Sequence, residues 1–403
     1  MIDIFKDIVF GISAIVGLYL LFNCVYLLFF AIAGHFLKKE KKGRVATLKK
    51  IAILIPAYKE DAVILESSFR AVNHSYDGEF KVFVVADGLS KNAIDKMNEF
   101  GCTVIPVYFE KSTKGKSLLC AMNLIPADRY DIALVLDIDN IMADNFLNDL
   151  NIAFADEHKV VQTHRTAKNL NTTFAFLDAC NEEINNHIYR KGHYAVGLSP
   201  ALIGSGMAFE FDYLHSLLKD IGETVGEDKE MDFKIAKDKN KIVYLNNTYV
   251  YDEKIENAKV FTQQRTRWIA AQIEFFKKYF FQGFRELFVN RNFEFFNKVL
   301  QSMLVPRMLL LGLLFVLSVA GFALLNSPLS YYFIVLFVVL CFTLLISLPL
   351  KFYRDRRLVS AVFKIPYALW CMVIALFRIK RAKVSFMPTP HTSNSQTDQL
   401  SQK

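Results

Sequence analysis

Three apolar runs, each about long enough to cross a membrane as a helix, lie on either side of a more polar central part of the chain. Residues 8–34 contain no charged residue and are long enough to cross a bilayer as a helix. Residues 304–325 and 331–350 are joined by only a short turn, and this spacing predicts a membrane hairpin. The pattern therefore predicts one membrane helix before the central part and a pair of membrane helices after it.

The basic residues beside these runs predict their orientation. Lysine and arginine are concentrated at 38–50, after the first run, and at 351–357, after the hairpin. By the positive-inside rule both flanks face the cytoplasm, and the central part of the chain lies there with them. A further apolar stretch, 358–377, is interrupted by Lys364 and Pro366 and has basic residues at both ends. We expect an interfacial or re-entrant helix there, with a fourth span as the alternative.

Between the membrane segments, apolar runs of strand length alternate with stretches of helical periodicity. The runs are nearly continuous, as in strands of a parallel sheet that is covered on both faces. The alternation predicts an α/β domain with a mostly parallel sheet and helices on both faces, in addition to the α-helical membrane segments. The predicted strands are 51–57, 81–86, 103–109 and 132–137, and the predicted helices are 61–74, 91–100 and 116–125.

Composition supports this organisation and argues against some functions. The chain has 403 residues, of which 53% are hydrophobic, and this suits a globular domain with membrane segments. The net charge of +8 comes mostly from the membrane-flanking clusters. No basic stripe with interleaved aromatic residues occurs, so no nucleic-acid partner is expected. The six cysteines are scattered without metal-site spacing, which is typical of free thiols in a reducing compartment.

Two aspartates follow the last predicted strand. Asp137 and Asp139 are separated by one residue, so both carboxylates of an extended chain face the same side. Two close carboxylates after a buried strand are costly without a cation, and a hard divalent ion that also binds diphosphate oxygens is their natural partner. The alternative is a pair of solvated turn aspartates, because the D-x-D pattern is common by chance.

The segment around Gly115-Lys116-Ser117 offers a competing interpretation, because it lies between a predicted strand and a predicted helix as a nucleotide-binding P-loop does. The P-loop motif requires its first glycine at position 110, which is Glu110 here. The loop then lacks its tight turn and carries a carboxylate near the phosphates, so an ATPase site is not favoured. No G-x-G-x-x-G segment indicates a dinucleotide site either.

Two other patterns indicate catalysis or ligand binding only when they are considered together with the other motifs. Glu227-Asp228 could take the proton of an acceptor hydroxyl, although an acidic pair at a helix start is ordinarily a cap. Gly204-x-Gly206 makes a turn where the backbone can approach a ligand, although most such turns are ordinary loops.

The segment Gln264-x-x-Arg267-Trp268 brings an amide, a guanidinium and an indole within about a turn and a half of helix. Arginine can hold a diphosphate through two hydrogen bonds, and tryptophan offers an apolar face on which a sugar ring can stack. The alternative is an amphipathic helix on the membrane, with arginine at the headgroups and tryptophan in the aromatic belt. The upstream carboxylates favour the sugar-nucleotide interpretation.

In this order the motifs resemble those of family-2 membrane glycosyltransferases, in particular the cellulose, hyaluronan, chitin and poly-N-acetylglucosamine synthase group. Each motif alone is weak, but the ordered set with Q-x-x-R-W is specific and covers residues 50–270. Phe386 with Thr389-Pro390-His391 also resembles the short cytoplasmic gating motif of these enzymes. The set is Pro56-Ala57-Tyr58-Lys59-Glu60, Asp87-Gly88, Gly115-Lys116 with Asn123, Asp137-x-Asp139, Gly204-x-Gly206, Glu227-Asp228 and Gln264-x-x-Arg267-Trp268.

The resemblance implies a GT-A-like domain that performs an inverting, single-displacement transfer from a UDP-sugar, with Mg²⁺ or Mn²⁺ as cofactor. It makes Asp228, beside Glu227, the general base, and it assigns Asp137 and Asp139 to the metal. The metal and Arg267 would then offset the charge on departing UDP. The resemblance assigns Ala57, Tyr58, Glu60, Asp87, Lys116, Asp137 and Asp139 to the donor, and Gln264, Arg267, Trp268, Gly204 and Gly206 to the diphosphate and acceptor.

The expected function is the synthesis of a β-linked cell-surface or extracellular polysaccharide, with the catalytic domain on the cytoplasmic side of the cell or inner membrane. Q-x-x-R-W also occurs in sphingolipid glucosyltransferases, so the transfer of one sugar to a lipid acceptor is the alternative. The chain offers only three or four membrane segments, so a complete polymer channel within one protomer is not expected. A homo-oligomer could share a pore, the interfacial helices could complete it, an export partner could supply it, or the enzyme exports no polymer. A non-catalytic nucleotide-binding member is a third hypothesis, and the full set of carboxylates argues against it.

The expected partners are thus a UDP-sugar, a polysaccharide or lipid-linked acceptor, and membrane lipid. The predicted parts are an N-terminal transmembrane helix with its basic flank (1–48), the catalytic domain (49–255), interfacial amphipathic helices with Q-x-x-R-W (256–300), a transmembrane hairpin (301–352), a re-entrant, interfacial or fourth membrane helix (353–385) and a cytoplasmic tail (386–403).

Overall fold

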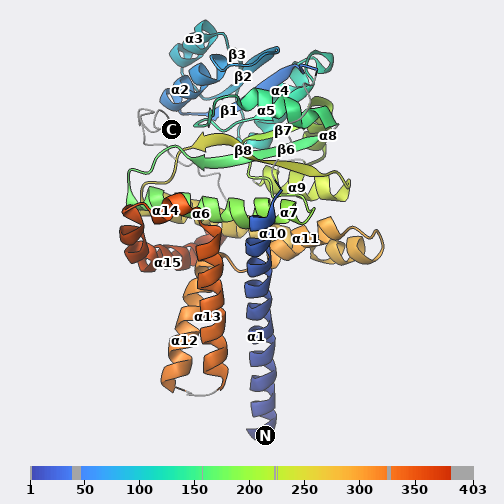
Figure 1. The fold of residues 1–403 in the computed structure, drawn as a ribbon. Coiled ribbons are helices and arrows are strands. Elements are labelled where there is room, and N and C mark those ends of the chain that lie inside the picture. The colour runs from blue at the N-terminus through green and yellow to red at the C-terminus, as the bar shows by residue number, and fades with distance from the viewer. Residues whose placement is uncertain are drawn as a thin grey trace.

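The computed structural model describes residues 2–38, 47–156, 158–221, 224, 226–324 and 328–382. The tail motif, Phe386 with Thr389-Pro390-His391, lies outside the described residues, as does most of the basic segment at 38–50. Figure 1 shows a layered domain above a set of helices that lie crosswise, and below them a stalk of long helices. The stalk consists of α1 (Ile2–Ala33), α12 (Arg307–Leu324) and α13 (Pro328–Ser347).

A mixed sheet forms the centre of the layered domain, with the strand order β3-β2-β1-β4-β7-β6-β8-β5. The strands from β3 to β4 are parallel neighbours, and so are β6 and β8, whereas β7 is antiparallel to both of its neighbours. The predicted α/β class with a mostly parallel sheet is confirmed. The strands are β1 (Ile51–Tyr58), β2 (Phe80–Asp87), β3 (Thr103–Val107), β4 (Ile132–Val135), β5 (Ile141–Met142), β6 (Val160–Ala167), β7 (Met207–Glu210) and β8 (Ile242–Asp252).

Helices cover both faces of this sheet. Ile53 and Ile55 of β1 belong to the core on one face, whereas Ala52 and Leu54 belong to the core on the other. This alternation is the period of two expected of a strand that is buried on both sides. The first core also contains α2 (Asp61–Val72), α3 (Lys91–Phe100) and α5 (Phe146–Ala153), and the second contains α4 (Lys114–Leu124), α8 (Phe211–Ile221) and α9 (Glu227–Lys237).

Below the sheet lies a layer that we call the helical belt. Its long helices begin at side-chain caps: Thr172 accepts a hydrogen bond from Ala175 N at 3.1 Å before α6, and Asn257 accepts one from Val260 N at 3.0 Å before α10. The belt consists of α6 (Thr173–Asn185), which continues through the π-helical η4 (Asn186–Gly192) into α7 (His193–Ala195), with α10 (Ala258–Phe288), α11 (Phe293–Met303), α14 (Leu350–Tyr353) and α15 (Arg357–Ala382).

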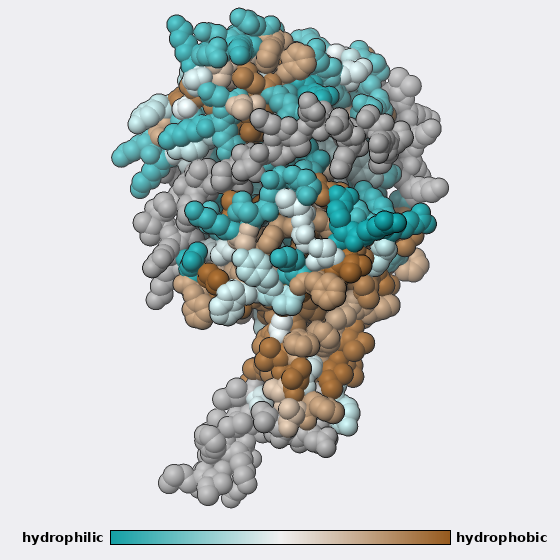
Figure 2. Space-filling view, turned by 90° about the vertical axis from the view of Figure 1, so that its left-hand side faces the viewer, coloured by the Kyte–Doolittle hydropathy of each residue, from teal (hydrophilic) through white to brown (hydrophobic). Residues whose placement is uncertain are grey.

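The stalk helices pack on one another and leave an apolar exterior. Buried leucines of all three helices share one core, including Leu27, Leu314 and Leu340. Figure 2 shows hydrophobic residues over the stalk where it leaves the polar upper part. Such an exterior is suited to lipid rather than to water.

Among the residues that the structure describes, two helices could cross a membrane by length and composition, Ser13–Phe36 and Arg357–Ile379, and a third could if the bent pair Phe293–Met303 and Arg307–Ala323 counts as one span. The apolar helix Tyr331–Ser347 is shorter. These helices are consistent with a membrane location. In Figure 1, α15 lies crosswise to the stalk beside the rest of the belt, and its interfacial or re-entrant placement stays a prediction.

Candidate active site

A cavity of about 640 Å³ lies between the sheet and the helical belt. We call its upper part the strand end, because residues that follow β1 and β4 line it, and its lower part the helix end. The strand end includes Ala57, Tyr58, Glu60, Asp137, Asp139, Lys114, Gly204, Glu227 and Asp228, and the helix end includes Arg307, Met308, Ala368 and Met372. Gln264, Arg267 and Trp268 of α10 line the same cavity, so the structure brings most of the predicted site residues together.

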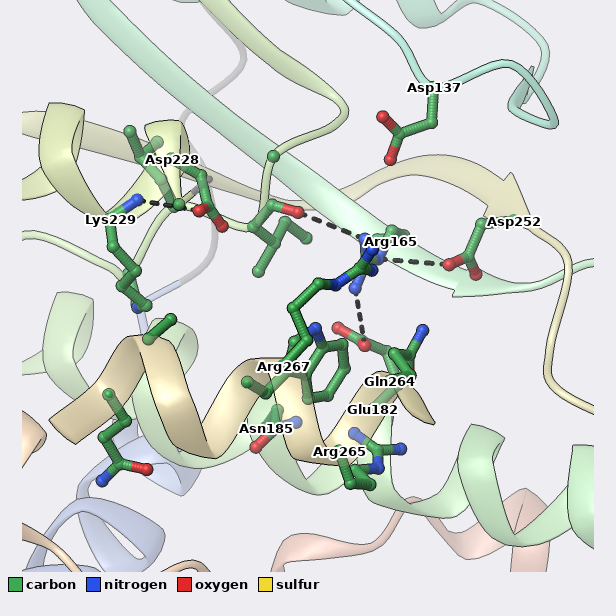
Figure 3. A pocket seen from close by; sticks show the side chains of 18 of the residues that line it. Asp137, Arg165, Glu182, Asn185, Asp228, Lys229, Asp252, Gln264, Arg265 and Arg267 are labelled. Atoms are coloured by element: carbon green, nitrogen blue, oxygen red, sulfur yellow. Dashed lines mark hydrogen bonds and ion pairs between the residues drawn. The ribbon is translucent and has the colours of Figure 1, made fainter. Parts of the chain in front are cut away.

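The two aspartates after β4 have different surroundings. Asp139 is buried, and its carboxylate accepts hydrogen bonds from Asn140 Nδ2 at 3.1 Å and from Glu253 N at 2.6 Å. Asp137 is only partly buried, and its carboxylate points into the cavity (Figure 3). Asp139 is therefore enclosed by the protein, whereas the Asp137 carboxylate pairs with the Lys114 ammonium and stays partly exposed to the cavity.

Lys114 occupies the place that the sequence assigned to Lys116. The ammonium of Lys114 pairs with the Asp137 carboxylate and donates to the Gly204 carbonyl at 2.6 Å. Lys116 Nζ instead donates to the Lys111 carbonyl at 3.2 Å, and Lys116 does not line the described cavity. The physical reason is that α4 begins at Lys114, and residues two apart on a helix point about 200° away from each other.

The surroundings of Lys114 stabilise its side chain in the positively charged form. Burial lowers the pKa of its ammonium, but the neighbouring Asp137 and Glu227 carboxylates more than offset this and raise the pKa above its usual value. A fixed cation therefore stands at the strand end, between Asp137 and the turn at Gly204.

Glu227 and Asp228 form the first turn of α9 and line the strand end. Burial raises the pKa of the Glu227 carboxyl, and the adjacent Asp228 raises it further. The Asp228 carboxylate is half-buried and accepts a hydrogen bond from Lys229 N at 2.8 Å. The pair therefore places two carboxyl groups on the cavity wall, and the predicted role of Asp228 as the general base stays a prediction.

The two glycines of Gly204-x-Gly206 have left-handed φ angles of +82° and +58°. A Cβ on Gly206 would lie 2.5 Å from Thr163 Oγ1 and 2.6 Å from Val250 Cγ1. Gly206 lies behind the cavity wall and shapes the turn, while Gly204 lines the cavity. Of the two glycines, only Gly204 is placed where the predicted contact with a ligand can form.

Asp87 is the last residue of β2 and Ala57 the last but one of the neighbouring β1, and only Ala57 lines the described cavity. Asp87 is buried, and its Oδ2 atom has no hydrogen-bond partner among the described residues. Lys59 N donates to the Asp87 carbonyl at 3.1 Å, which ties the two strand ends together. Asp87 thus keeps an acceptor oxygen available beside the strand end, and its predicted contact with the donor stays a prediction.

Arg165 of β6 stands at the centre of the cavity wall (Figure 3), and sequence reasoning missed it. Its guanidinium pairs with Glu182 at 2.9 Å and Asp252 at 3.3 Å and donates to the Ile203 carbonyl at 3.2 Å. Burial lowers the pKa of Arg165, but the two carboxylates outweigh this and raise it. No local signal could reveal this group, because its partners come from separate parts of the chain.

Gln264, Arg267 and Trp268 of the Q-x-x-R-W segment line the cavity from α10. A helix that only lay on the membrane surface would not need to place these side chains there. Burial lowers the pKa of Arg267, while the Glu227 and Asp228 carboxylates oppose this effect. Trp268 is 39% exposed, and the Arg265 guanidinium lies 4.2 Å from its ring centre. Arg265 is itself paired with Asp178. The indole is thus held on one side by a cation and is partly open on the other.

The strand end suits a hard metal ion, although the protein alone does not complete a metal site. Among the described residues, no three His, Cys, Asp or Glu side chains are grouped as a ready ligand set. Burial raises the pKa of Asp252 to about 6, and the nearby Asp139 adds to the rise. Mg²⁺ commonly takes one or two carboxylates and completes its shell with water and phosphate oxygens. The carboxylates of Asp137 and Asp139 therefore fit such an ion when it arrives with a diphosphate.

Comparison with known families decides the class of the protein. The family model described as "Glycosyltransferase like family 2" matches residues 49–271, which is more than half of the chain. The chain belongs to this family. The glycosyltransferase family includes more than the polysaccharide-synthase group, and these comparisons do not single out that group.

Two curated relatives of this glycosyltransferase are β-monoglucosyldiacylglycerol synthases. The protein from Trichormus variabilis is 24% identical over 267 residues, and that from Nostoc sp. is 24% identical over 271 residues. Each match covers 64% of this chain and 55% of the relative. The chain thus spans about half the length of the curated relatives it matches.

A solved structure with a similar fold is the mannosyltransferase from Pyrobaculum calidifontis, determined in complex with GDP-Man and Mn²⁺. Its TM-score is 0.54 at 15% sequence identity, and the match covers 91% of this chain and 98% of the mannosyltransferase chain. The likeness at this identity concerns the fold, and it confirms the predicted GT-A-like architecture.

Proposed function

We propose that this glycosyltransferase is a membrane enzyme that transfers one sugar from a UDP-sugar to a lipid acceptor, with inversion at the sugar. The observation that carries the proposal is the continuity of the cavity. It runs from the carboxylates Asp137 and Asp228 to Met308 and Met372, which belong to the apolar helices α12 and α15. The names of the curated relatives, which are glycolipid synthases, support the lipid acceptor over a polysaccharide.

The strand end holds the groups that such a reaction needs. A hydroxyl of the acceptor attacks the anomeric carbon, the bond from that carbon to the diphosphate breaks, and the proton of the hydroxyl passes to Asp228. Lys114 and Arg267 place positive charge where the departing diphosphate becomes more negative. Asp137 and Asp139 would hold Mg²⁺ or Mn²⁺, which supplies further positive charge to the diphosphate when bound.

The helix end fits a lipid. Met308 is the second residue of α12, and Ala368 and Met372 lie on neighbouring turns of α15, so apolar side chains form part of the cavity wall there. The residues after Pro306 pass directly into the stalk. A lipid headgroup can therefore occupy the cavity while its chains stay with the apolar stalk.

The test is UDP release by the purified protein in lipid nanodiscs, with a panel of UDP-sugars, with Mg²⁺ or Mn²⁺, and with products analysed by mass spectrometry. We expect release with one donor, lipid carrying a single added sugar, and loss of both after chelation. A ladder of products would support the polysaccharide alternative instead. An absence of release with every donor and lipid would contradict the proposal.

A further inference from the structure

Arg307, the first residue of α12, lies on the wall of the helix end and has an incomplete set of partners. Its side chain is only 8% exposed. Nη2 donates to Asn181 Oδ1 at 2.9 Å, to Asn185 Oδ1 at 2.7 Å and to the Asn181 carbonyl at 3.2 Å. Nη1 is buried and has no hydrogen-bond partner among the described residues. One side of a buried guanidinium thus lacks an acceptor.

The other buried cations around the lower cavity differ from Arg307 in one respect. Each of them is paired with a carboxylate of the protein, which offsets the cost of taking the charge out of water. In the part of the chain that the structure describes, no carboxylate forms an ion pair with Arg307. The compared pairs are Arg190 with Glu182 at 3.4 Å, Lys298 with Asp232 at 2.8 Å, and Arg265 with Asp178.

An unpaired buried guanidinium is costly, because the neutral amide oxygens of Asn181 and Asn185 do not balance its charge. Its position is nevertheless held by the hydrogen bonds from Nη2 to Asn181 and Asn185. The guanidinium carbon also lies 5.8 Å from the ring centre of Tyr189, another residue of the cavity wall. A held cation with an open donor matches an anionic ligand that brings its own oxygens.

The surroundings of Arg307 narrow the class of that ligand. Met308, Ala368 and Met372 line the same part of the cavity, so the anionic group must lie next to apolar chains. The diphosphate of the donor does not meet this condition, because the cations proposed for it interact with carboxylates of the strand end: Lys114 pairs with Asp137, and Arg267 lies close enough to Asp228 for the two charges to interact. A phosphate in the headgroup of a lipid does meet it, and the planar guanidinium binds phosphate through two parallel hydrogen bonds.

Building on the proposed lipid glycosyltransferase, we propose that the acceptor carries a phosphate between its apolar chains and its accepting hydroxyl, and that Arg307 binds this phosphate. The accepting hydroxyl then reaches upward toward Asp228, and the chains remain at α12 and α15. A diacylglycerol has no such phosphate, so the acceptor differs in this respect from the lipid in the name of the curated relatives.

The experiment compares two acceptors in phosphatidylcholine nanodiscs, phosphatidylglycerol and dioleoylglycerol, with the wild type and Arg307→Gln. We expect wild-type transfer to phosphatidylglycerol, and a KM for this lipid that is about tenfold to a hundredfold higher in the variant because a charge-assisted hydrogen bond is lost. The kcat and the KM for the UDP-sugar should change little. Arg307→Lys should recover part of the affinity, because it keeps the charge.

A matched control separates binding in the cavity from general attraction to an anionic surface. Arg285→Gln removes an exposed arginine from α10 in the same helical belt, and its KM for phosphatidylglycerol should equal that of the wild type. Thermal unfolding and UDP binding of each variant show that the fold and the upper site are intact. If Arg307→Gln does not fold, the same comparison is made with Arg307→Lys, whose KM should rise for phosphatidylglycerol only.

Two results would overturn the assignment. One is efficient transfer to dioleoylglycerol, with an equal effect of the substitution on both acceptors. The other is stimulation of dioleoylglycerol glycosylation by phosphatidic acid that Arg307→Gln removes, since the phosphate would then belong to a bystander lipid. If the wild type transfers sugar to no lipid while it still releases UDP, the proposed lipid acceptor itself is wrong. This outcome contradicts the proposed function and can be told apart from the two results that contradict only the role of Arg307.

Discussion

The strand end and the helix end of the cavity hold their charged groups by different means. At the strand end, Asp137, Lys114 and Asp228 stand where a strand ends or a helix begins, so the local backbone places them. Around the helix end, cations such as Lys298 are placed by carboxylates from distant segments and by packing between helices. We therefore expect changes at the strand end to alter the chemical step, and changes at the helix end to alter stability or acceptor binding.

The largest effect on the chemical step is expected from Asp228→Asn. The amide keeps the shape of the side chain but cannot take the acceptor proton, so kcat should fall about 10²–10⁴-fold while UDP binding persists. Calorimetry of UDP binding beside the transfer assay checks both parts. Asp212→Asn, which changes an exposed aspartate of α8, is the matched control and should retain full activity. An active Asp228→Asn enzyme would remove the assignment of the base.

Lys298→Met should have the largest effect on stability. The ammonium lies 2.8 Å from Asp232, and both side chains are 3% exposed, so the substitution leaves a buried carboxylate with only a longer contact to Lys229 at 3.9 Å. We expect a loss of about 3–5 kcal/mol in the free energy of unfolding, and a smaller loss when Asp232→Leu is added. Lys234→Met breaks the exposed pair with Asp220 and should cost less than about 1 kcal/mol. Equal losses for the two lysine variants would contradict the comparison.

Trp268→Ala probes the position where the two ends meet. If the acceptor packs on the open face of the indole, its KM should rise about twofold to tenfold, with little change in the melting temperature. The chain offers a close control, because Trp370 on α15 is also exposed and does not line the described cavity. Trp370→Ala should leave the KM unchanged, and a similar rise for both variants would point to contact with the membrane instead.

The pH profile should give the smallest effect. Burial and Asp228 raise the pKa of Glu227, and the active pair must be deprotonated, so kcat/KM should fall with decreasing pH at a higher pH than an ordinary carboxylate would produce. Glu227→Gln removes one of two interacting charges and should move this acidic limb toward lower pH by about one unit. A limb that stays in place would mean that another group controls it.

The sequence predicted the part of the fold that depends on local patterns. The strands β1, β2, β3 and β4 are continuous apolar runs, and each was predicted within a few residues of its observed bounds. The strand β6 was missed because Gln162, Thr163 and His164 are buried although they are polar. Gln162 Nε2 donates to the Ser205 carbonyl at 3.0 Å, and His164 Nε2 lies 3.1 Å from Glu183. Tertiary hydrogen bonds supply these partners, and no periodicity in the sequence reports them.

The same limit applies to the site. The D-x-D, Glu-Asp and Q-x-x-R-W segments were recognisable because their chemistry lies within a few residues. Lys114 was missed in favour of Lys116, since only the start of α4 decides which lysine faces the cavity. Arg165 and Arg307 carry no local signal, because their partners lie on other elements. Groups placed by long-range packing therefore require the structure.

The contact between α1 and η4 has a practical consequence for anyone who prepares the enzyme without its first helix. A Cβ on Gly192 would lie 2.1 Å from the Phe30 carbonyl oxygen, so the two backbones touch. Tyr26 adds hydrogen bonds to His193 at 3.0 Å and to Asn297 at 2.7 Å. The helix η4 also supplies Tyr189 to the cavity wall. Deletion of α1 would therefore remove the support behind the proposed acceptor site as well as an apolar helix long enough to cross a membrane.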